Sequence, residues 1–429
     1  MTKISKNTSS VAVTALVITF APPGDVLSRC LDSLRRQDPR PHIIIADNFS
    51  LTDPKHEIAD SFQARDCSVV TFDRNYGFGG AINRVLPEIK SRYILISNFD
   101  IIYDPKYIAF AVWRLEQAEN NVVGIAGKTL FYPPNADENW PGAGPGDDRP
   151  ETGKGTGAVI DNVGTLVNGL MLAYNRGIGQ IDIGQYDVPD RPMGACFAAF
   201  FAKTDSFDPI ENGGAGLLDE SYFMYYEDID WCYRANILGK EIHYEPRAIA
   251  WHHHSLTTRN LSVFFKYHLI QRNLYRTIIR NMKFRTAVKL HAFHARMHIR
   301  RARVEKIFAP VTWKILWEML LWTPIGLFRR TPIQRYRKKT DTEIINLSIG
   351  EEGHLDDLSL RPKADWKNVN ASIERLSRLF PEDPAAEIAP YAKQLADGKG
   401  TLELSDRVQK MIQERCSGLS RLIKIIRKP

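Results

Sequence analysis

Four short apolar runs near the start of the chain constrain its fold more than any other feature. They cover residues 11–20, 41–46, 67–72 and 92–98. The runs are rich in valine and isoleucine and end in polar residues, and apolar residues recur at helical spacing between them, as at Leu27, Leu31 and Leu34. Strands that alternate with helices form a parallel sheet covered by helices. We therefore predict an α/β fold with a mostly parallel, Rossmann-like sheet that has helices on both faces.

Polar residues stand where these predicted strands end. Ligands of an open parallel sheet bind at the carboxyl ends of its strands. The candidate binding residues are therefore Thr19, Asp47, Asn48, Asn75 and Asp100. A carboxylate such as Asp100 also suits a divalent cation that bridges phosphates, because hard cations prefer oxygen ligands. The alternative for each aspartate is a turn or cap residue.

A glycine-rich segment, NYGFGGA at residues 75–81, precedes a predicted helix. Its glycines allow backbone N–H groups to approach phosphate or sugar oxygens. The segment lacks both the glycine spacing of a dinucleotide-binding fingerprint and the lysine of a P-loop. It therefore predicts a contact to the ligand but neither of those two sites.

The region after Leu217 is dense in carboxylates. Glu227, Asp228 and Asp230 directly follow the apolar stretch 222–226. Partial burial at such a position raises the pKa of a carboxylate toward the range of a general base, which indicates an enzyme. The alternative is a solvated helix N-terminus at which the carboxylates offset the helix dipole.

Three adjacent histidines, His252, His253 and His254, end a strand pattern. An imidazole at this position is able to bind a metal or to contact a phosphate. A purely structural role is the alternative.

Composition narrows the class of protein. The chain has 429 residues, of which 44% are hydrophobic and 25% charged, so it is globular and long enough for about two or three domains. Its five cysteines form no C-x-x-C pair. This pattern indicates neither a disulfide framework nor a cysteine zinc site, and it fits a reducing compartment.

The net charge of +7 is distributed unevenly. Residues 256–339 contain 20 lysines and arginines but only two glutamates, a balance of +18, which leaves −11 for the rest. Part of this region, residues 307–328, is apolar and holds three tryptophans, but it also contains charges and prolines that argue against a simple membrane span. Basic residues beside interfacial aromatics predict helices that lie on an anionic membrane surface. The alternatives are a packed hairpin and nucleic-acid binding, although no nucleic-acid recognition motif is present.

Three regions follow from these patterns. We expect a nucleotide-binding and catalytic domain at residues 1–255, a basic helical membrane-associating region at 256–340 and a helical extension at 341–429. The segment 132–156 is dense in proline and glycine and reads as a long loop, either a lid or an insertion. The amphipathic basic stretch 407–428 is a candidate docking helix.

Several stretches together resemble the family 2 glycosyltransferases with the GT-A fold, especially their bacterial rhamnosyltransferase-like branch. They are VITF…LSRCLDSLRRQ at 17–37, IIIADNFS at 43–50, NYGFGGAIN at 75–83, YILISNFDI at 93–101 and GACFAAFFAKTDSF with the acidic segment that follows it. The segment 264–276 also resembles the helix that follows the catalytic domain in this branch. About 260 residues are covered.

The resemblance implies transfer of a sugar, with inversion, from a nucleotide donor to an acceptor hydroxyl. It assigns Asp228 as the general base, with Glu227 beside it as a second catalytic residue. Asp100 matches the second acidic position of the family's D-x-D metal motif, with Asn98 at the first position, and His252 falls near the metal, with His254 as the reserve. The implied cofactor is Mg²⁺ or Mn²⁺.

The remaining site residues are also implied by the resemblance. The donor would be bound by Thr19, Asp47, Asn48, Asn75, Gly79, Gly80, Asn83, Asp100 and Arg272. For Arg272 the alternative, which we favour, is that it orders its helix. The acceptor would be bound by Trp231, Glu220 and Gly194.

The expected partners are a nucleotide-diphosphate sugar, a glycan or polyprenyl-linked glycan acceptor and an anionic membrane surface. No nucleic acid is expected, and a homo-oligomer is possible. The implied location is cytoplasmic, on the inner face of the cell membrane. L-Rhamnose or another deoxyhexose is the expected sugar. Galactofuranosyl transfer, and a catalytically silent GT-A module that scaffolds a membrane assembly, remain the alternatives.

Overall fold

The structure, a computed structural model, describes residues 13–50, 66–132, 156, 158–180, 182, 184, 186–253 and 261–349. Several predicted features lie outside these residues. They are most of the loop 132–156, His254, the candidate docking helix 407–428 and the rest of the extension beyond residue 349.

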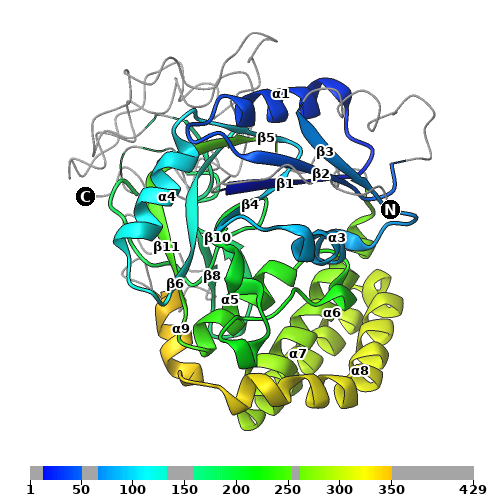
Figure 1. The fold of residues 1–429 in the computed structure, drawn as a ribbon. Helices are drawn as coiled ribbons and strands as arrows, with labels where there is room; N and C mark the ends of the chain where they lie inside the picture. Colours follow the sequence, from blue (N-terminus) through cyan, green and yellow to red (C-terminus); the bar gives the residue numbers. More distant parts are fainter. Residues whose placement is uncertain are drawn as a thin grey trace, which may run out of the picture.

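The first half of the sheet is parallel. It is formed by β1 (Val13–Thr19), β2 (His42–Asp47), β3 (Cys67–Thr71) and β4 (Tyr93–Asn98). These strands lie in the order β3-β2-β1-β4, and each neighbouring pair is parallel. The four strands predicted from the apolar runs are therefore confirmed. Their carboxyl ends meet at one edge of the sheet (Figure 1).

The second half of the sheet mixes directions. It contains β10 (Ala199–Lys203), β6 (Val122–Phe131), β11 (Glu241–His252), β5 (Ile101–Tyr103) and β7 (Ile160–Asn162). β10 is antiparallel to both β4 and β6, whereas β11 is parallel to β6. Short β5 and β7 are antiparallel to β11 and β6. The predicted parallel arrangement thus describes β1 to β4, while the α/β class holds for the whole sheet.

Helices cover both faces of the sheet (Figure 1). α1 (Gly24–Arg35) and α4 (Tyr107–Gln117) pack on one face, and α3 (Gly77–Val85) and α5 (Glu227–Ile237) pack on the other. Alternate residues of each central strand point to opposite faces, so one strand contributes to both cores. This double coverage explains why the strands read as nearly continuous apolar runs.

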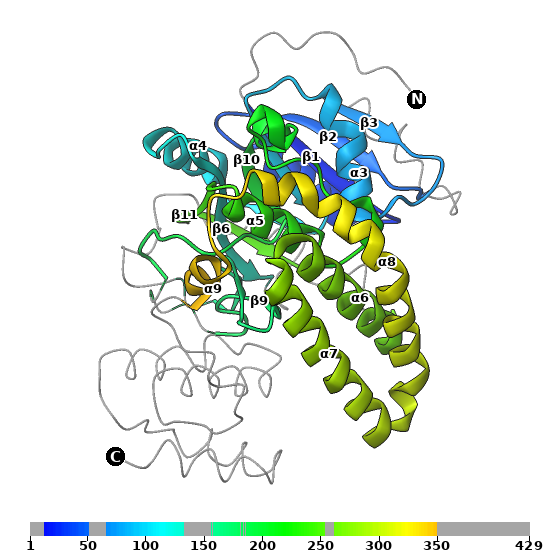
Figure 2. The same cartoon turned by 90° about the horizontal axis from the view of Figure 1, so that it is seen from below.

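A separate layer of helices follows the sheet. It consists of α6 (Val263–Asn281), α7 (Phe284–Val304), α8 (Ala309–Arg335) and α9 (Asp341–Ile349). α6, α7 and α8 lie side by side and project away from the sheet (Figure 2). α8 continues through Pro324 and Pro332. None of the helices described has the length and apolar character that a membrane crossing requires. A small hairpin of β8 (Thr165–Val167) and β9 (Ala173–Asn175) completes the described structure.

Candidate active site

The ends of β1 and β2 bring two predicted donor-binding residues together. Thr19 Oγ1 donates a hydrogen bond to Asp47 Oδ1 at 3.3 Å. The same carboxylate oxygen accepts hydrogen bonds from the backbone N–H of Ser50, at 3.2 Å, and from the Ser50 hydroxyl. Asp47 therefore makes the Asx-type turn that was the alternative to ligand binding, and this turn fixes its carboxylate at the sheet edge.

Asn48 and Asn75 tie the end of β2 to the glycine-rich turn. The Asn48 side chain donates to Asn75 Oδ1 at 3.0 Å and to the carbonyl of Gly77 at 3.1 Å, and it accepts from the Tyr76 N–H at 2.8 Å. Asn75 Oδ1 also accepts from the Gly77 N–H at 2.8 Å. Both amides are thus engaged within the protein, where they set the position of the turn.

The other residues of the glycine-rich segment pack against the segment that precedes α5. Asn83 binds both the carbonyl and the N–H of Leu218, at 2.9 and 3.1 Å. A Cβ on Gly79 would lie 3.1 Å from the Leu218 side chain, and a Cβ on Gly80 would lie 3.1 Å from that of Tyr76. Gly79 and Asn83 therefore hold the glycine-rich segment against the segment before α5, whereas Gly80 packs within its own segment.

Asp100, Asp161 and His252 meet at the end of β4. His252 Nδ1 lies 2.7 Å from Asp161 Oδ2, and its Nε2 lies 3.4 Å from Asp100 Oδ1. All three side chains are buried. Burial opposes a charge on the imidazole, but the two nearby carboxylates outweigh it and raise the pKa of His252 to about 10. Asp161 was not predicted, because its partners are distant in the sequence.

Glu227 and Asp228 begin α5. The Glu227 side chain is buried, and its Oε2 accepts no hydrogen bond from the residues described. Asp228 is half-buried and accepts from the N–H of Ile229 at 2.8 Å and from the N–H of Phe197 at 3.4 Å. Burial, followed by the charge of Asp228, raises the pKa of Glu227 to about 8, and burial also raises the pKa of Asp228. Near neutral pH Glu227 is therefore expected to be mainly protonated.

The segment 196–198 joins the two carboxylate groups. Its Phe197 N–H faces Asp228, and the Ala198 carbonyl accepts from the N–H of Asn98 at the end of β4 at 2.8 Å. Burial and then the charges of Asp228 and Asp161 raise the pKa of the Cys196 thiol well above its usual range. A cavity lies beside this segment, lined in part by Asp161, Cys196 and Ala198. The segment 196–198 thus contacts both the end of β4 and the start of α5.

Ionisation of Glu227 is expected to weaken the fold as the pH rises. The native state binds this proton more tightly than the unfolded chain, so the contribution is full below the ordinary pKa of 4.5 and is lost as the pH approaches about 8. Glu227→Gln should therefore exceed the wild type in unfolding free energy, at pH values above about 8, by at least ~1.4 kcal/mol, the equivalent of one pKa unit. Urea denaturation at acidic and alkaline pH measures this difference. An equal difference at both pH values would contradict it.

The turn that leads into α5 has an unusual backbone. Phe223, Tyr225 and Tyr226 all have positive φ, at 66°, 69° and 71°. Such conformations are costly for large side chains and persist only where the surroundings enforce them. We call residues 221–226 the base turn, because it positions Glu227 and Asp228.

Side chains of α6 hold the base turn. Asn273 is fully buried, and its amide N–H groups donate to the carbonyls of Tyr222, Met224 and Tyr225 at 3.0, 2.9 and 2.7 Å. Arg272 donates to the Tyr222 carbonyl at 2.8 Å. Arg272, predicted to bind the donor or to order its helix, therefore contacts the base turn in the structure. Asn273 was missed, because no sequence pattern shows which carbonyls a helix amide will meet.

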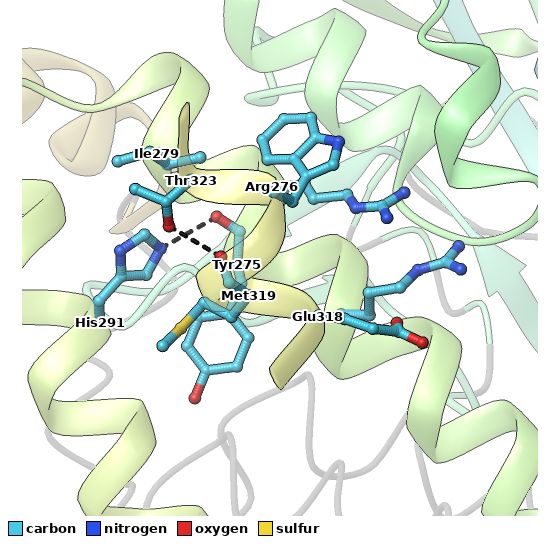
Figure 3. A pocket seen from close by; sticks show the side chains of 9 residues that line it. Tyr275, Arg276, Ile279, His291, Glu318, Met319 and Thr323 are labelled. Atoms are coloured by element: carbon cyan, nitrogen blue, oxygen red, sulfur yellow. Dashed lines mark hydrogen bonds between the residues drawn. The ribbon is translucent and has the colours of Figure 1, made fainter. Parts of the chain in front are cut away.

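A cavity lies beside Arg272, between α6, α7 and α8 (Figure 3). Arg272, Arg276 and Glu318 line it, together with Trp322. Burial and then the charge of Arg276 lower the pKa of Arg272 to about 10. The carbonyl oxygens of the base turn offset this repulsion between the two guanidinium groups.

The predicted acceptor residues all have structural contacts within the protein. Trp231 has no exposed surface and packs against Phe197, Phe200 and Phe207, while its indole N–H donates to the Gly216 carbonyl at 2.8 Å. A Cβ on Gly194 would lie 2.7 Å from that of Cys232, so this glycine permits close packing on α5. Glu220 pairs with Arg84 at 3.0 Å. A direct acceptor contact by Trp231 would require it to leave the core.

Two other acidic residues of the cluster are tied to arginines. Asp230 accepts from Arg234 at 3.1 Å and from Arg280 at 2.9 Å. Asp219 pairs with Arg280 at 2.9 Å and with Arg329 at 2.8 Å. Burial alone would raise the pKa of Asp219, but the arginines and a hydrogen bond from the Ser221 N–H lower it to about 2. Asp230 therefore joins α5 to α6, and Asp219 joins the segment before α5 to α6 and α8.

Together, the sheet with polar residues at its strand ends and the acid pair at the start of α5 define a GT-A domain. The fold resembles the crystal structure of GalNAc-T7 with UDP, GalNAc and Mn²⁺, with a TM-score of 0.50 at 15% identity over 68% of this chain and 51% of that one. S. aureus TarS 1–349 matches with a TM-score of 0.42 at 13% identity over 78% of this chain and 90% of that one.

Sequence comparison finds a matching family model. Residues 14–159 match the model described as glycosyl transferase family 2. The chain is also 40% identical over 110 residues to the rhamnosyltransferase WbbL of Escherichia coli (strain K12). That match covers 24% of this chain and 39% of the length of WbbL.

Proposed function

We propose that the protein is an inverting glycosyltransferase with Asp228 as its general base. It would move a sugar, L-rhamnose or another deoxyhexose, from a nucleotide-diphosphate donor to a hydroxyl of a lipid-linked or surface glycan. One observation carries the proposal. The acid pair of α5 and the carboxylates at the end of β4 lie on either side of the segment 196–198.

The chemistry follows from this arrangement. An acceptor hydroxyl has a pKa far above 7 and must lose its proton as it attacks the anomeric carbon. Asp228 is suited to accept that proton, because its pKa is raised by burial while the neighbouring Glu227 is mainly protonated near neutral pH. Attack from the face opposite the departing diphosphate inverts the anomeric centre in a single displacement.

The GT-A fold implies a divalent cation, and the residues at the end of β4 fit one in part. Asp100 supplies a buried carboxylate whose Oδ1 accepts no hydrogen bond from the residues described. His252 lies beside it but is held as an imidazolium, so it would have to release its Nε2 proton to bind a metal. Within the described ranges, no three histidine, cysteine or acidic side chains are arranged to hold a metal ion. Mg²⁺ or Mn²⁺ held by Asp100 and His252 would offset the charge of the leaving diphosphate.

The donor can be identified with purified full-length protein. We expect a deoxyhexose nucleotide to raise the melting temperature more than the other members of a panel of nucleotide sugars, and Mn²⁺ to increase the shift. Transfer or donor hydrolysis should follow the same preference. Preference for a galactofuranosyl donor would replace the deoxyhexose assignment. Binding without any turnover would instead favour a silent scaffold.

A further inference from the structure

The outer face of α8 is an exposed apolar ridge. Residues at positions 313, 317, 320, 321, 324 and 328 follow one side of a helix and are all apolar. Trp313 and Trp317 are each 60% exposed, and Phe328 is 81% exposed. Single exposed apolar residues are ordinary on proteins, but a continuous row of them marks an interaction surface.

A second group of exposed apolar residues lies where α6 begins, α7 ends and α8 begins. The rings of Phe264 and Phe308 are 5.2 Å apart, which shows that these segments converge. Val263, Val304 and Ile307 are 69%, 76% and 68% exposed at this convergence. The tip projects away from the sheet (Figure 2). We call the tip and the outer face of α8 together the helical ridge.

Positive charge surrounds the helical ridge. Exposed basic side chains lie on α7, on the short turn that follows it and at the start of α8, at Arg296, Arg300, Arg303, Lys306 and Lys314. The region 256–339 as a whole carries +18. Apolar and aromatic side chains mixed with lysine and arginine are suited to the boundary between the head groups and acyl chains of an anionic bilayer.

We propose that the helical ridge inserts shallowly into an anionic membrane surface. The charge argues for lipid and against a second copy of the chain, because self-association through this face would bring two regions of +18 together. The described helices are not suited to cross the bilayer, so the ridge would lie in its surface. This proposal is consistent with a lipid-linked acceptor but does not depend on catalysis.

Flotation of the full-length protein with vesicles tests the proposal. We expect it to float with phosphatidylcholine vesicles that contain phosphatidylglycerol, and to float less at high salt or without the anionic lipid. The double substitution Trp313→Ala and Trp317→Ala should weaken binding by roughly tenfold or more. Trp113→Ala is the matched control, because Trp113 is 46% exposed on α4, away from the ridge, and should leave binding unchanged.

Two results would overturn the proposal. One is wild-type vesicle binding by the double tryptophan variant, which would place the contact elsewhere in the chain. The other is the absence of flotation together with a dimer that the double variant converts to a monomer in light scattering, which would make the ridge a self-association surface. Because the assay contains no donor, Asp228→Asn should float like the wild type, so failure of the catalytic proposal would be seen separately.

Discussion

Asp228→Asn is expected to lower turnover by about 100- to 10,000-fold, the range associated with loss of a general base. The amide retains an oxygen that can accept from the Ile229 N–H, so the start of α5 should stay folded, but it cannot take the proton of an acceptor hydroxyl. Donor affinity should change little, because the substitution leaves the strand-end residues untouched. Steady-state transfer assays and nucleotide-sugar titrations measure the two effects.

Glu227→Gln is the matched control for this substitution. If Glu227 is mainly protonated near neutral pH, a neutral amide imitates its state there, and turnover should remain far above that of Asp228→Asn. Activity of the wild type should rise with pH through the raised pKa of Asp228, since only the ionised carboxylate accepts a proton. If Glu227→Gln is inactive while Asp228→Asn turns over within a few-fold of wild type, the two roles are reversed.

Asn273→Ala is expected to have the second-largest effect, on both stability and turnover. It removes the amide contacts to the base turn, so the carbonyls of Met224 and Tyr225 lose this donor, while the Tyr222 carbonyl keeps its hydrogen bond from Arg272. Each unsatisfied buried group costs about 1–3 kcal/mol, so we expect a loss of roughly 2 kcal/mol or more in unfolding free energy. The left-handed backbone at positions 223, 225 and 226 would also lose its restraint, which should displace Asp228.

The kinetic pattern distinguishes positioning from general destabilisation. Under conditions where Asn273→Ala is still folded, kcat should fall while the KM for the donor stays within a few-fold of wild type. Gln271→Ala is a suitable control, because Gln271 lies on the same helix but contacts His298. Asn273→Asp should not restore activity, since it places a carboxylate against carbonyl oxygens. An unchanged kcat in folded Asn273→Ala would show that the base turn keeps its conformation without Asn273.

Local patterns were sufficient to predict the first half of the sheet. The apolar runs of β1 to β4 and the helical spacing of Leu27, Leu31 and Leu34 depend on neighbours in the sequence, and the structure confirms them. The antiparallel insertion of β10 between β4 and β6 was not predicted, because strand pairing joins residues about 75 to 110 positions apart. Composition carries no information on such pairings.

The same limit applies to the site. The acidic cluster pointed to a catalytic region, but the sequence could not separate Asp228 from Asp230. Asp228 is half-buried, whereas Asp230 is fully buried and has arginine and asparagine partners on α5 and α6. The family resemblance implied an acceptor contact for Trp231, but this side chain lies on the face of α5 that packs into the core. Asp161 lies 91 positions before His252, so its contact with His252 became evident only from the structure.

The contact between the glycine-rich turn and the base turn limits how the chain can be divided. A Cβ on Gly77 would lie 2.2 Å from the Phe223 carbonyl oxygen, and this oxygen also accepts a hydrogen bond from the Phe78 N–H at 2.8 Å. Asn273 of α6 donates hydrogen bonds to other carbonyls of the same turn. A truncation near residue 255 would therefore remove α6, which holds the turn that positions the acid pair. Chimeras that exchange donor preference between relatives should keep α3, the base turn and α6 from a single parent.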